Sequence, residues 1–194
     1  IETLEKSRGL ARETLRAMTV TSDEGAHYAH ELELDLTALT PMIARPGDPR
    51  NGQAVAALDA DVPIQIAYGG SCTGGKAHDM DLYASVFADA LPKGQRVAPG
   101  VSCFIQYGSQ HIRAYAESRG YDAIFRDVGA TVLAPSCGAC ISAGPGASKD
   151  ASTVTISAQN RNFPGRSGPG DVWLASPLTV AASAIAGRVV AHGG

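Results

Sequence analysis

Strand-like and helix-like stretches alternate along most of this chain, and this alternation constrains its fold more than any other feature of the sequence. Strands that alternate with helices form a mainly parallel sheet that is covered on both faces. We therefore predict an α/β fold with a three-layer α/β/α, doubly wound, mostly parallel sheet. The predicted strands are 62–68, 101–106, 130–134, 153–157 and 172–175, and the predicted helices are 79–91, 109–119 and 177–187.

The N-terminal part of the sequence does not follow this pattern. Charges and leucines at helical spacing predict an amphipathic helix over 2–18. The segment 28–36 contains the alternating run HELELDL and predicts a strand with one polar face, and the prolines and glycine of 41–51 predict a surface loop. We divide the chain into an N-terminal helix and linker, 1–21, and a single α/β domain, 22–194.

Composition excludes several classes of protein. The chain has 194 residues and a net charge of −3, which suits one domain with a proper core and argues against nucleic acid as the main partner. It has no apolar run as long as a membrane span, and nothing at its start reads as a signal peptide, so we expect no membrane partner. The four cysteines favour metal binding in a reducing compartment over a disulfide framework. Because the chain starts with Ile1 and not Met, we expect it to be a fragment of a larger chain.

Three cysteines follow predicted strands, where an open parallel sheet binds its ligands. Cys72 follows the strand 62–68, and Cys137 and Cys140 follow the strand 130–134. Thiolates select zinc or iron–sulfur clusters. Three thiolates suit a cubane with four irons, because one iron then lacks a protein ligand and could polarise a substrate oxygen. We predict a Lewis-acid cluster that acts on a small polycarboxylate.

An arginine-rich turn follows the next predicted strand, 153–157. Its sequence is NRNFPGR, from Asn160 to Arg166. Guanidinium groups bind carboxylates through paired hydrogen bonds. Arg161 and Arg166 are therefore candidate substrate ligands at the same edge of the sheet.

Each of these features also has a structural interpretation. A Cys-x2-Cys pair alone is often half of a structural zinc site or a redox pair, and Cys72 and Cys103 could complete four zinc ligands. Against this, Cys103 lies inside an apolar strand, which favours a buried small side chain. The arginines could pair with acids or helix ends. We also expect Ser109 to be an N-cap, Trp173 to be a packing residue, and His78, at the start of a helix, to be a weaker site candidate.

Together these motifs resemble the iron–sulfur domain of the aconitase and 3-isopropylmalate dehydratase (large subunit) family. The resemblance runs from about 22 to 188 and includes GSCT at 70–73, CGAC at 137–140, NRNFPGR at 160–166 and LASP at 174–177. The form of the last two motifs is closer to dehydratases of the isopropylmalate and homoaconitate type than to citrate aconitase. Gly74 departs from the pattern, because the family has asparagine there.

The resemblance implies a fold of the aconitase iron–sulfur domain type and a role for each motif. Cys72, Cys137 and Cys140 would ligate a [4Fe–4S] cluster, Arg161 and Arg166 would pair with substrate carboxylates, and Asn160 would hydrogen-bond near the cluster. The reaction would be a dehydration and rehydration that moves a hydroxyl group between adjacent carbons of a hydroxy di- or tricarboxylate.

The resemblance also implies partners and a compartment. The other catalytic groups would lie on remaining domains of the same chain or on a small partner subunit, so this piece alone would not turn over substrate. We expect a cytoplasmic protein, or a mitochondrial matrix protein in a eukaryote. The alternative is a non-catalytic iron–sulfur or zinc-binding domain with a structural or regulatory role.

Overall fold

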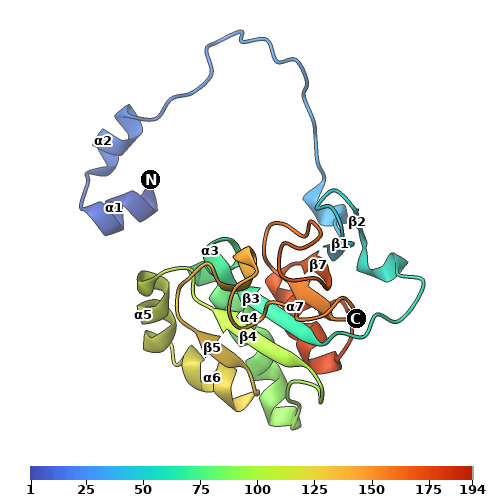
Figure 1. Ribbon diagram of the computed structural model, residues 1–194. Coiled ribbons are helices and arrows are strands. Elements are labelled where there is room, and N and C mark those ends of the chain that lie inside the picture. Colours follow the sequence, from blue (N-terminus) through green and yellow to red (C-terminus); the bar gives the residue numbers. More distant parts are fainter. Residues whose placement is uncertain (194) are drawn as a thin grey trace. The chain divides into compact units, whose positions relative to one another are not determined.

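The computed structural model describes residues 1–193 and divides the chain into two compact units, Ile1–Leu39 and Thr40–Gly194. The smaller unit contains two short α-helices and a 3-10 turn (Figure 1). Its elements are α1 (Glu2–Arg8), α2 (Arg12–Ala17) and η1 (Leu36–Ala38).

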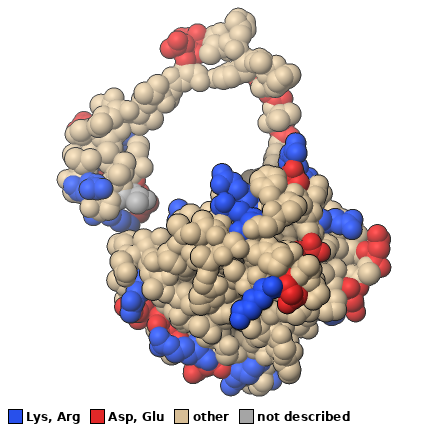
Figure 2. Space-filling model, viewed as in Figure 1, with Lys and Arg blue, Asp and Glu red and all other residues tan. Residues whose placement is uncertain are grey.

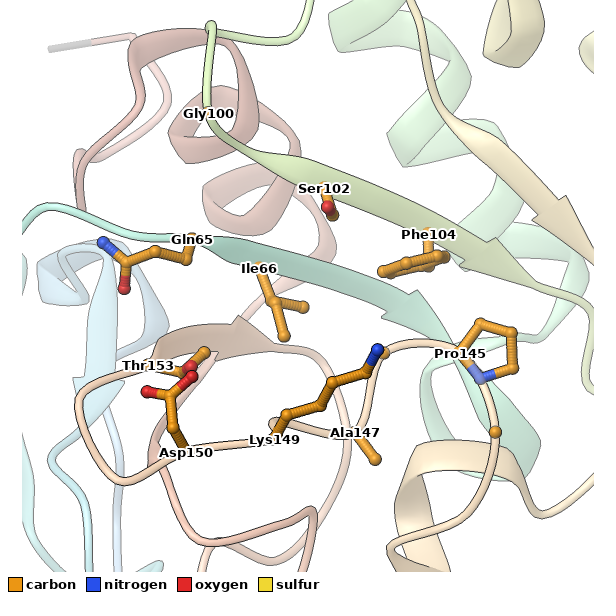
Figure 3. Close-up of a pocket in the computed structure, with 12 residues that line it drawn as sticks. Gln65, Ile66, Gly100, Ser102, Phe104, Pro145, Ala147, Lys149, Asp150 and Thr153 are labelled. Atoms are coloured by element: carbon orange, nitrogen blue, oxygen red, sulfur yellow. The ribbon is translucent and has the colours of Figure 1, made fainter.

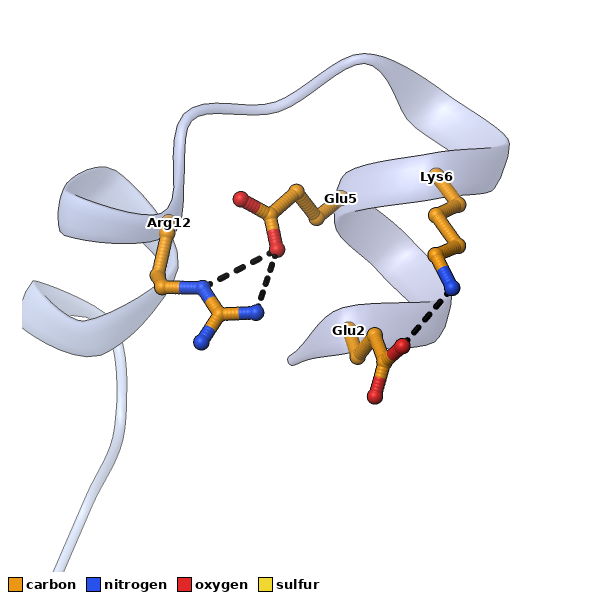
Figure 4. A network of polar contacts seen from close by, with 4 residues as sticks. All are labelled: Glu2, Glu5, Lys6 and Arg12. Carbon is orange, nitrogen blue, oxygen red and sulfur yellow. Dashed lines mark hydrogen bonds and ion pairs between the residues drawn. The ribbon is translucent and has the colours of Figure 1, made fainter.

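The single helix predicted over 2–18 is wrong, because glycine interrupts it. Gly9 adopts the left-handed conformation with φ 63° and ends α1, and its N–H donates to the carbonyl of Glu5. Glycine adopts this conformation without steric cost, so it commonly ends helices. The Arg12 guanidinium reaches back to the Glu5 carboxylate at 2.8 Å and links α2 to α1 (Figure 4).

The strand predicted over 28–36 is also wrong. The segment is irregular until η1 begins, and Leu32 and Leu34 are 96% and 67% exposed. Alternating polarity makes a strand only where a neighbouring strand completes the hydrogen-bond ladder. This segment has no such neighbour among the described residues, so its alternation leaves apolar side chains in solvent.

The larger unit is built on one seven-stranded sheet in the order β2-β1-β7-β6-β3-β4-β5 (Figure 1). The strands from β7 to β5 are parallel, and β1 and β2 form an antiparallel edge. The chain runs outward from β3 to β5 and then crosses to β6, as in a doubly wound sheet. The strands are β1 (Met42–Ala44), β2 (Gly52–Ala54), β3 (Ile66–Gly70), β4 (Ser102–Gln106), β5 (Thr131–Leu133), β6 (Val154–Ser157) and β7 (Asp171–Ala175).

The α/β fold class predicted from the sequence is confirmed, and most predicted elements occur within a few residues of their expected bounds. The predicted loop 41–51 is wrong at its start, because β1 lies there as an edge strand. Two helices, the short α3 and α6, were not predicted. The helices of the larger unit are α3 (Ser71–Gly74), α4 (Ala77–Ala90), α5 (Gln110–Ser118), α6 (Tyr121–Asp127) and α7 (Pro177–Ala186), with 3-10 turns η2 (Val55–Ala57), η3 (Leu91–Lys93) and η4 (Gly138–Ile141).

The main core lies on the sheet face that the longer helices cover. Helix α4 packs against α5, α6 and α7, and α7 also packs on β3. Strand residues alternate between the two faces of a sheet. The strand residues in this core include Ala67, Cys103, Ile105 and Ile156. Asp79 starts α4 by accepting a hydrogen bond from the Lys76 N–H at 2.9 Å, and Ser176 caps α7.

The opposite face is covered by the long connection between β5 and β6, which contains η4. Ile66 and Phe104 point toward this connection from β3 and β4 and line a pocket beneath Pro145 and Lys149 (Figure 3). Tyr68 lies on the same face and is fully buried. A Cβ added at Gly146 would lie 2.3 Å from Tyr68 Cδ2, so the connection rests directly on the tyrosine ring.

The contact with Tyr68 predicts that Gly146→Ala destabilises the larger unit by about 2–4 kcal/mol, because it combines a strained φ of +90° with overpacking against the ring. Gly144→Ala is the matched control. Its φ is +69° and no atom lies within 4 Å of its added Cβ, so only about 1 kcal/mol of backbone strain is expected. Urea unfolding followed by the fluorescence of Trp173, the single tryptophan, measures both losses. Equal losses would contradict the packing of this connection on Tyr68.

Candidate functional site

The predicted site motifs follow strands that are neighbours in the sheet. Strands β6, β3, β4 and β5 are adjacent and parallel, so their carboxyl ends lie at one edge. Cys72 follows β3, the pair Cys137 and Cys140 follows β5, and the turn that begins with Asn160 follows β6. The sheet order therefore brings the connections that carry the three motifs to a common edge.

The Cys72 turn, residues 70–75, depends on glycine because backbone approaches it from two sides. Gly70 has φ +107°, and a Cβ on it would lie 1.9 Å from the carbonyl oxygen of Gln106. A Cβ on Gly74 would lie 2.5 Å from the carbonyl oxygen of Ala158 on the next connection. Any side chain at position 74 would therefore clash with this backbone.

Ser71 also marks this turn as strained. Its φ is +68°, and it is one of two non-glycine residues in the described chain with a positive φ. The other is Ser142, with φ +58°, which follows Cys140. Such residues are uncommon and cluster at functional sites. Both cysteine motifs thus carry backbone that an ordinary connection avoids.

A buried tyrosine holds the Cys72 turn from the helical side. The Tyr83 hydroxyl of α4 accepts a hydrogen bond from the Gly70 N–H at 3.1 Å and donates one to the Gly74 carbonyl at 3.0 Å. Burial raises the pKa of Tyr83, so the hydroxyl stays protonated and can donate. The two ends of the turn are therefore fixed to α4.

The second cysteine motif forms the tight turn η4. The Cys140 N–H donates to the Cys137 carbonyl at 3.0 Å, and the Ala143 N–H donates to the Gly138 carbonyl at 3.1 Å. Cys137 is exposed and Cys140 is half-buried. A hollow beside Cys137 is lined mainly by apolar atoms, with Ile141, Ala143 and Leu133 in its wall.

The arginine turn contacts the second cysteine motif through Arg166. Its Nη2 lies 3.2 Å from the Sγ of Cys140, and its buried Nε has no acceptor among residues 1–193. Arg161 and Asn160 are exposed. The structure therefore places Arg166 against a predicted metal ligand and leaves Arg161 and Asn160 open to solvent.

Asn162, which the sequence did not single out, fixes the arginine turn to the sheet. It is 2% exposed, and its Nδ2 donates to the carbonyls of Arg45 and Val172 at 2.7 and 3.1 Å. The carbonyl of Asn162 accepts from the N–H of Gly47 at 3.1 Å. The middle of this turn is thus structural, and its ends carry the exposed or ligand-facing groups.

The donor set fits an iron–sulfur cluster. All four cysteines are free, and within residues 1–193 no three His, Cys, Asp or Glu side chains lie close enough together to form a metal site by themselves. The fit comes from the chemistry of the groups: three free thiols, and a buried Nε of Arg166 for which the described residues provide no acceptor. Buried polar atoms usually have a partner. Thr155 Oγ1 and Asn162 Oδ1 also lack one among the described residues, but only Arg166 contacts a predicted ligand, so sulfide, thiolate or carboxylate would suit its Nε.

The remaining candidate residues have structural positions. Cys103 is 3% exposed in the main core, and burial raises the pKa of its thiol to about 12, so it suits the packing role and not a fourth metal ligand. The Ser109 hydroxyl accepts from the Ile112 N–H, which confirms the predicted N-cap. Trp173 is confirmed as a core residue, and His78 is exposed.

A pocket, the surface charge and the helix lengths complete the description of the surface. The pocket of Figure 3 lies beneath the β5–β6 connection, and none of its lining residues was a predicted site residue. In the view of Figure 2, basic and acidic side chains of the larger unit form small separate groups. No described helix has both the length and the apolar character needed to cross a membrane.

Comparisons with known proteins agree with this geometry. Residues 57–187 match the model of the aconitase family (aconitate hydratase). The chain is 40% identical over 177 residues to a protein named homoaconitase, mitochondrial, from Gibberella zeae, with 89% of this chain and 23% of that protein covered. It is 42% identical over 171 residues to the 3-isopropylmalate dehydratase large subunit of Campylobacter concisus, with 87% of this chain and 39% of that protein covered.

The matched region contains all three motifs and the strands that carry them. The chain spans 23% and 39% of the length of these two relatives, so it corresponds to a part of each. The family match extends over more than half of the chain. This chain therefore belongs to the aconitase family.

Proposed function

We propose that this chain is the cluster-binding domain of a hydro-lyase that dehydrates and rehydrates a 2- or 3-hydroxy di- or tricarboxylate. Isopropylmalate and homocitrate or homoaconitate are the proposed substrates. The observation that carries the proposal is the position of three free cysteines and Arg166 at one sheet edge, with the Arg166 guanidinium 3.2 Å from Cys140. The two relatives, named homoaconitase and 3-isopropylmalate dehydratase, support the substrate class.

In this proposal Cys72, Cys137 and Cys140 hold a [4Fe–4S] cluster. The bound cluster supplies a Lewis acid, the iron without a protein ligand, that lowers the barrier to departure of a hydroxyl group. The glycines of the Cys72 turn let neighbouring backbone approach at positions where a side chain would collide with it.

The arginines bind and orient the substrate. Arg166 is half-buried, and its free Nε gives it a donor beyond the one directed at Cys140, so it suits a substrate carboxylate close to the cluster. Arg161 is exposed and suits a second carboxylate that enters from solvent. Asn160, also exposed, would hydrogen-bond near the cluster.

The same proposal covers domain organisation, partners and compartment. The predicted single domain 22–194 remains a prediction, and its compact part begins at Thr40. We propose that the other catalytic groups come from further domains of a longer chain or from a small partner subunit, as the words "large subunit" in the name of one relative suggest. We also propose a cytoplasmic location, or the mitochondrial matrix in a eukaryote.

Anaerobic reconstitution with iron and sulfide tests the cluster. We expect about four irons per chain and a broad absorption at about 400 nm, as is usual for such clusters. Changing Cys72, Cys137 or Cys140 to serine removes a thiolate ligand, so each variant should lose most of the iron and the absorption. Metal analysis and the absorption spectrum measure both.

Cys103→Ala is the matched control for these variants. It also removes a thiol, but from the core and not from the site, so it should keep the wild-type iron content. Stoichiometric zinc without a cluster would contradict the proposal and favour the alternative, a structural or regulatory metal-binding domain.

Arg166→Lys tests the carboxylate site. Lysine keeps the positive charge but loses the paired donors of the guanidinium, so we expect the affinity of the reconstituted protein for 3-isopropylmalate to fall by about 10- to 100-fold. Isothermal titration calorimetry measures the dissociation constant.

Arg126→Lys is the control for this substitution. Arg126 is an exposed residue of α6 that pairs with Asp122 at 3.0 Å, so its replacement should leave the affinity unchanged. An Arg166→Lys protein that binds as tightly as the wild type would rule out a direct contact with the substrate.

A further inference from the structure

A buried amide connects the two cysteine motifs. Gln106 ends β4, the strand between β3 and β5, and is 1% exposed. Its register partner in β3 is Gly70, and its carbonyl oxygen fills the space that a Cβ on Gly70 would need. Its side chain extends to the other motif, toward the residues that precede Cys137.

The hydrogen bonds of the Gln106 side chain are complete. Its Nε2 donates to the Ser136 Oγ at 2.6 Å and to the Ala134 carbonyl at 3.2 Å. Its Oε1 accepts from the Tyr68 hydroxyl at 2.7 Å. The carbonyl of Ala134 can only accept, so the amide nitrogen must face it, and this fixes the orientation of the amide.

Tyr68 supports this amide from β3. Its ring is fully buried. Burial raises the pKa of Tyr68 to about 12, so the hydroxyl remains a donor near neutral pH. A Cβ on Gly138, next to Cys137, would lie 2.9 Å from the Tyr68 hydroxyl oxygen and 3.1 Å from Gln106 Nε2, so the cysteine turn rests on this pair of side chains.

Core packing alone does not explain these groups. A leucine at position 106 would be buried in water-excluded surroundings without the cost of desolvating an amide. The three hydrogen bonds of the Gln106 side chain instead go to Tyr68 and to Ala134 and Ser136, which lie three residues and one residue before Cys137. A fully satisfied buried network of this kind holds its members in one arrangement.

We propose that Gln106, supported by Tyr68, is a positioning residue that sets the spacing between the Cys72 turn and the Cys137–Cys140 turn. This inference deepens the proposed function and rests on it, because the spacing matters for a shared cluster. Gln106 does not touch the cluster or the substrate in this proposal and acts through the backbone of both turns.

Hydrogen exchange in the metal-free protein tests the positioning directly. The amides of Cys140, Ser142 and Ala143 are hydrogen-bonded inside the turn, so their protection reports on its order. Gln106→Leu should make them exchange about 10- to 100-fold faster, because it leaves the Ala134 carbonyl and the Tyr68 hydroxyl without a partner. Tyr68→Phe keeps both bonds of Nε2 and should have a smaller effect.

Thr155→Val is the matched control. Thr155 lies on β6 and is buried, and its hydroxyl has no hydrogen-bond partner, so the isosteric change should leave the turn at wild-type protection. A uniform increase of exchange in β4, α4 and the turn would show a general loss of stability and would overturn the inference. Wild-type protection of the turn in Gln106→Leu would overturn it too.

Release of iron from the reconstituted protein to a chelator links the inference to function. We expect Gln106→Leu to lose iron at least about 10-fold faster than both the wild type and Thr155→Val. The release rates are compared between proteins that unfold at the same urea midpoint. Equal rates would overturn the inference even if the wild type binds a cluster. If the wild type binds no cluster, the proposed function fails, while faster exchange confined to the turn would still support the anchoring by Gln106.

Discussion

The site depends on the parallel pairing of β3 with both of its neighbours. Residues 66–70 pair with β4 along their whole length and with β6 over their first three positions, so the chain leaves the sheet at Gly70 between two strands that end beside it. This pairing explains why motifs separated by about 90 residues of sequence follow adjacent strands. It also sets a steric limit, because a turn that starts between two backbones has little room for side chains. A Cβ added at Gly70, Gly74 or Gly75 would lie within 2.5 Å of a backbone oxygen. At position 74 the connection after β6 approaches so closely that a Cβ would lie 2.5 Å from the carbonyl oxygen of Ala158.

Each cysteine turn is held by a buried tyrosine from a different face of the sheet. Tyr83 binds both ends of the Cys72 turn from the helical face, and Tyr68 supports the Cys137 turn from the other face through Gln106. Both hydroxyls are in surroundings that raise their pKa, so both remain neutral donors across the physiological range. Fixed dipoles of this kind restrict the backbone without adding charge next to the cysteines. The thiols themselves remain accessible, because the anchoring groups lie beneath the turns.

The sequence predicted the fold and the motif positions because both depend on local signals. Strand and helix patterns repeat through 62–187, and the cysteine and arginine motifs are distinctive in themselves. It failed where structure depends on a partner. The alternation in 28–36 has no adjacent strand to pair with, and β1 is an edge strand of three residues hidden among prolines. It also missed Gln106 and Tyr68, which look like ordinary members of mostly apolar strands. The signal that could have found Gln106 was a polar residue at the end of the strand Ser102–Gln106, at a position that the sheet was expected to bury.

The buried Nε of Arg166 favours a binding role for this residue over a purely structural one. A guanidinium placed only to stabilise the fold would be expected to satisfy its buried donors with protein acceptors, because an unpaired buried donor costs about 1–3 kcal/mol. Arg166 instead directs one nitrogen at the half-buried Cys140 and leaves another without an acceptor. Asn162, four residues earlier, already ties the turn to the sheet, so Arg166 is not needed for that purpose. An anion bound next to Cys140 would supply an acceptor for Arg166, which is the carboxylate role that we propose for it.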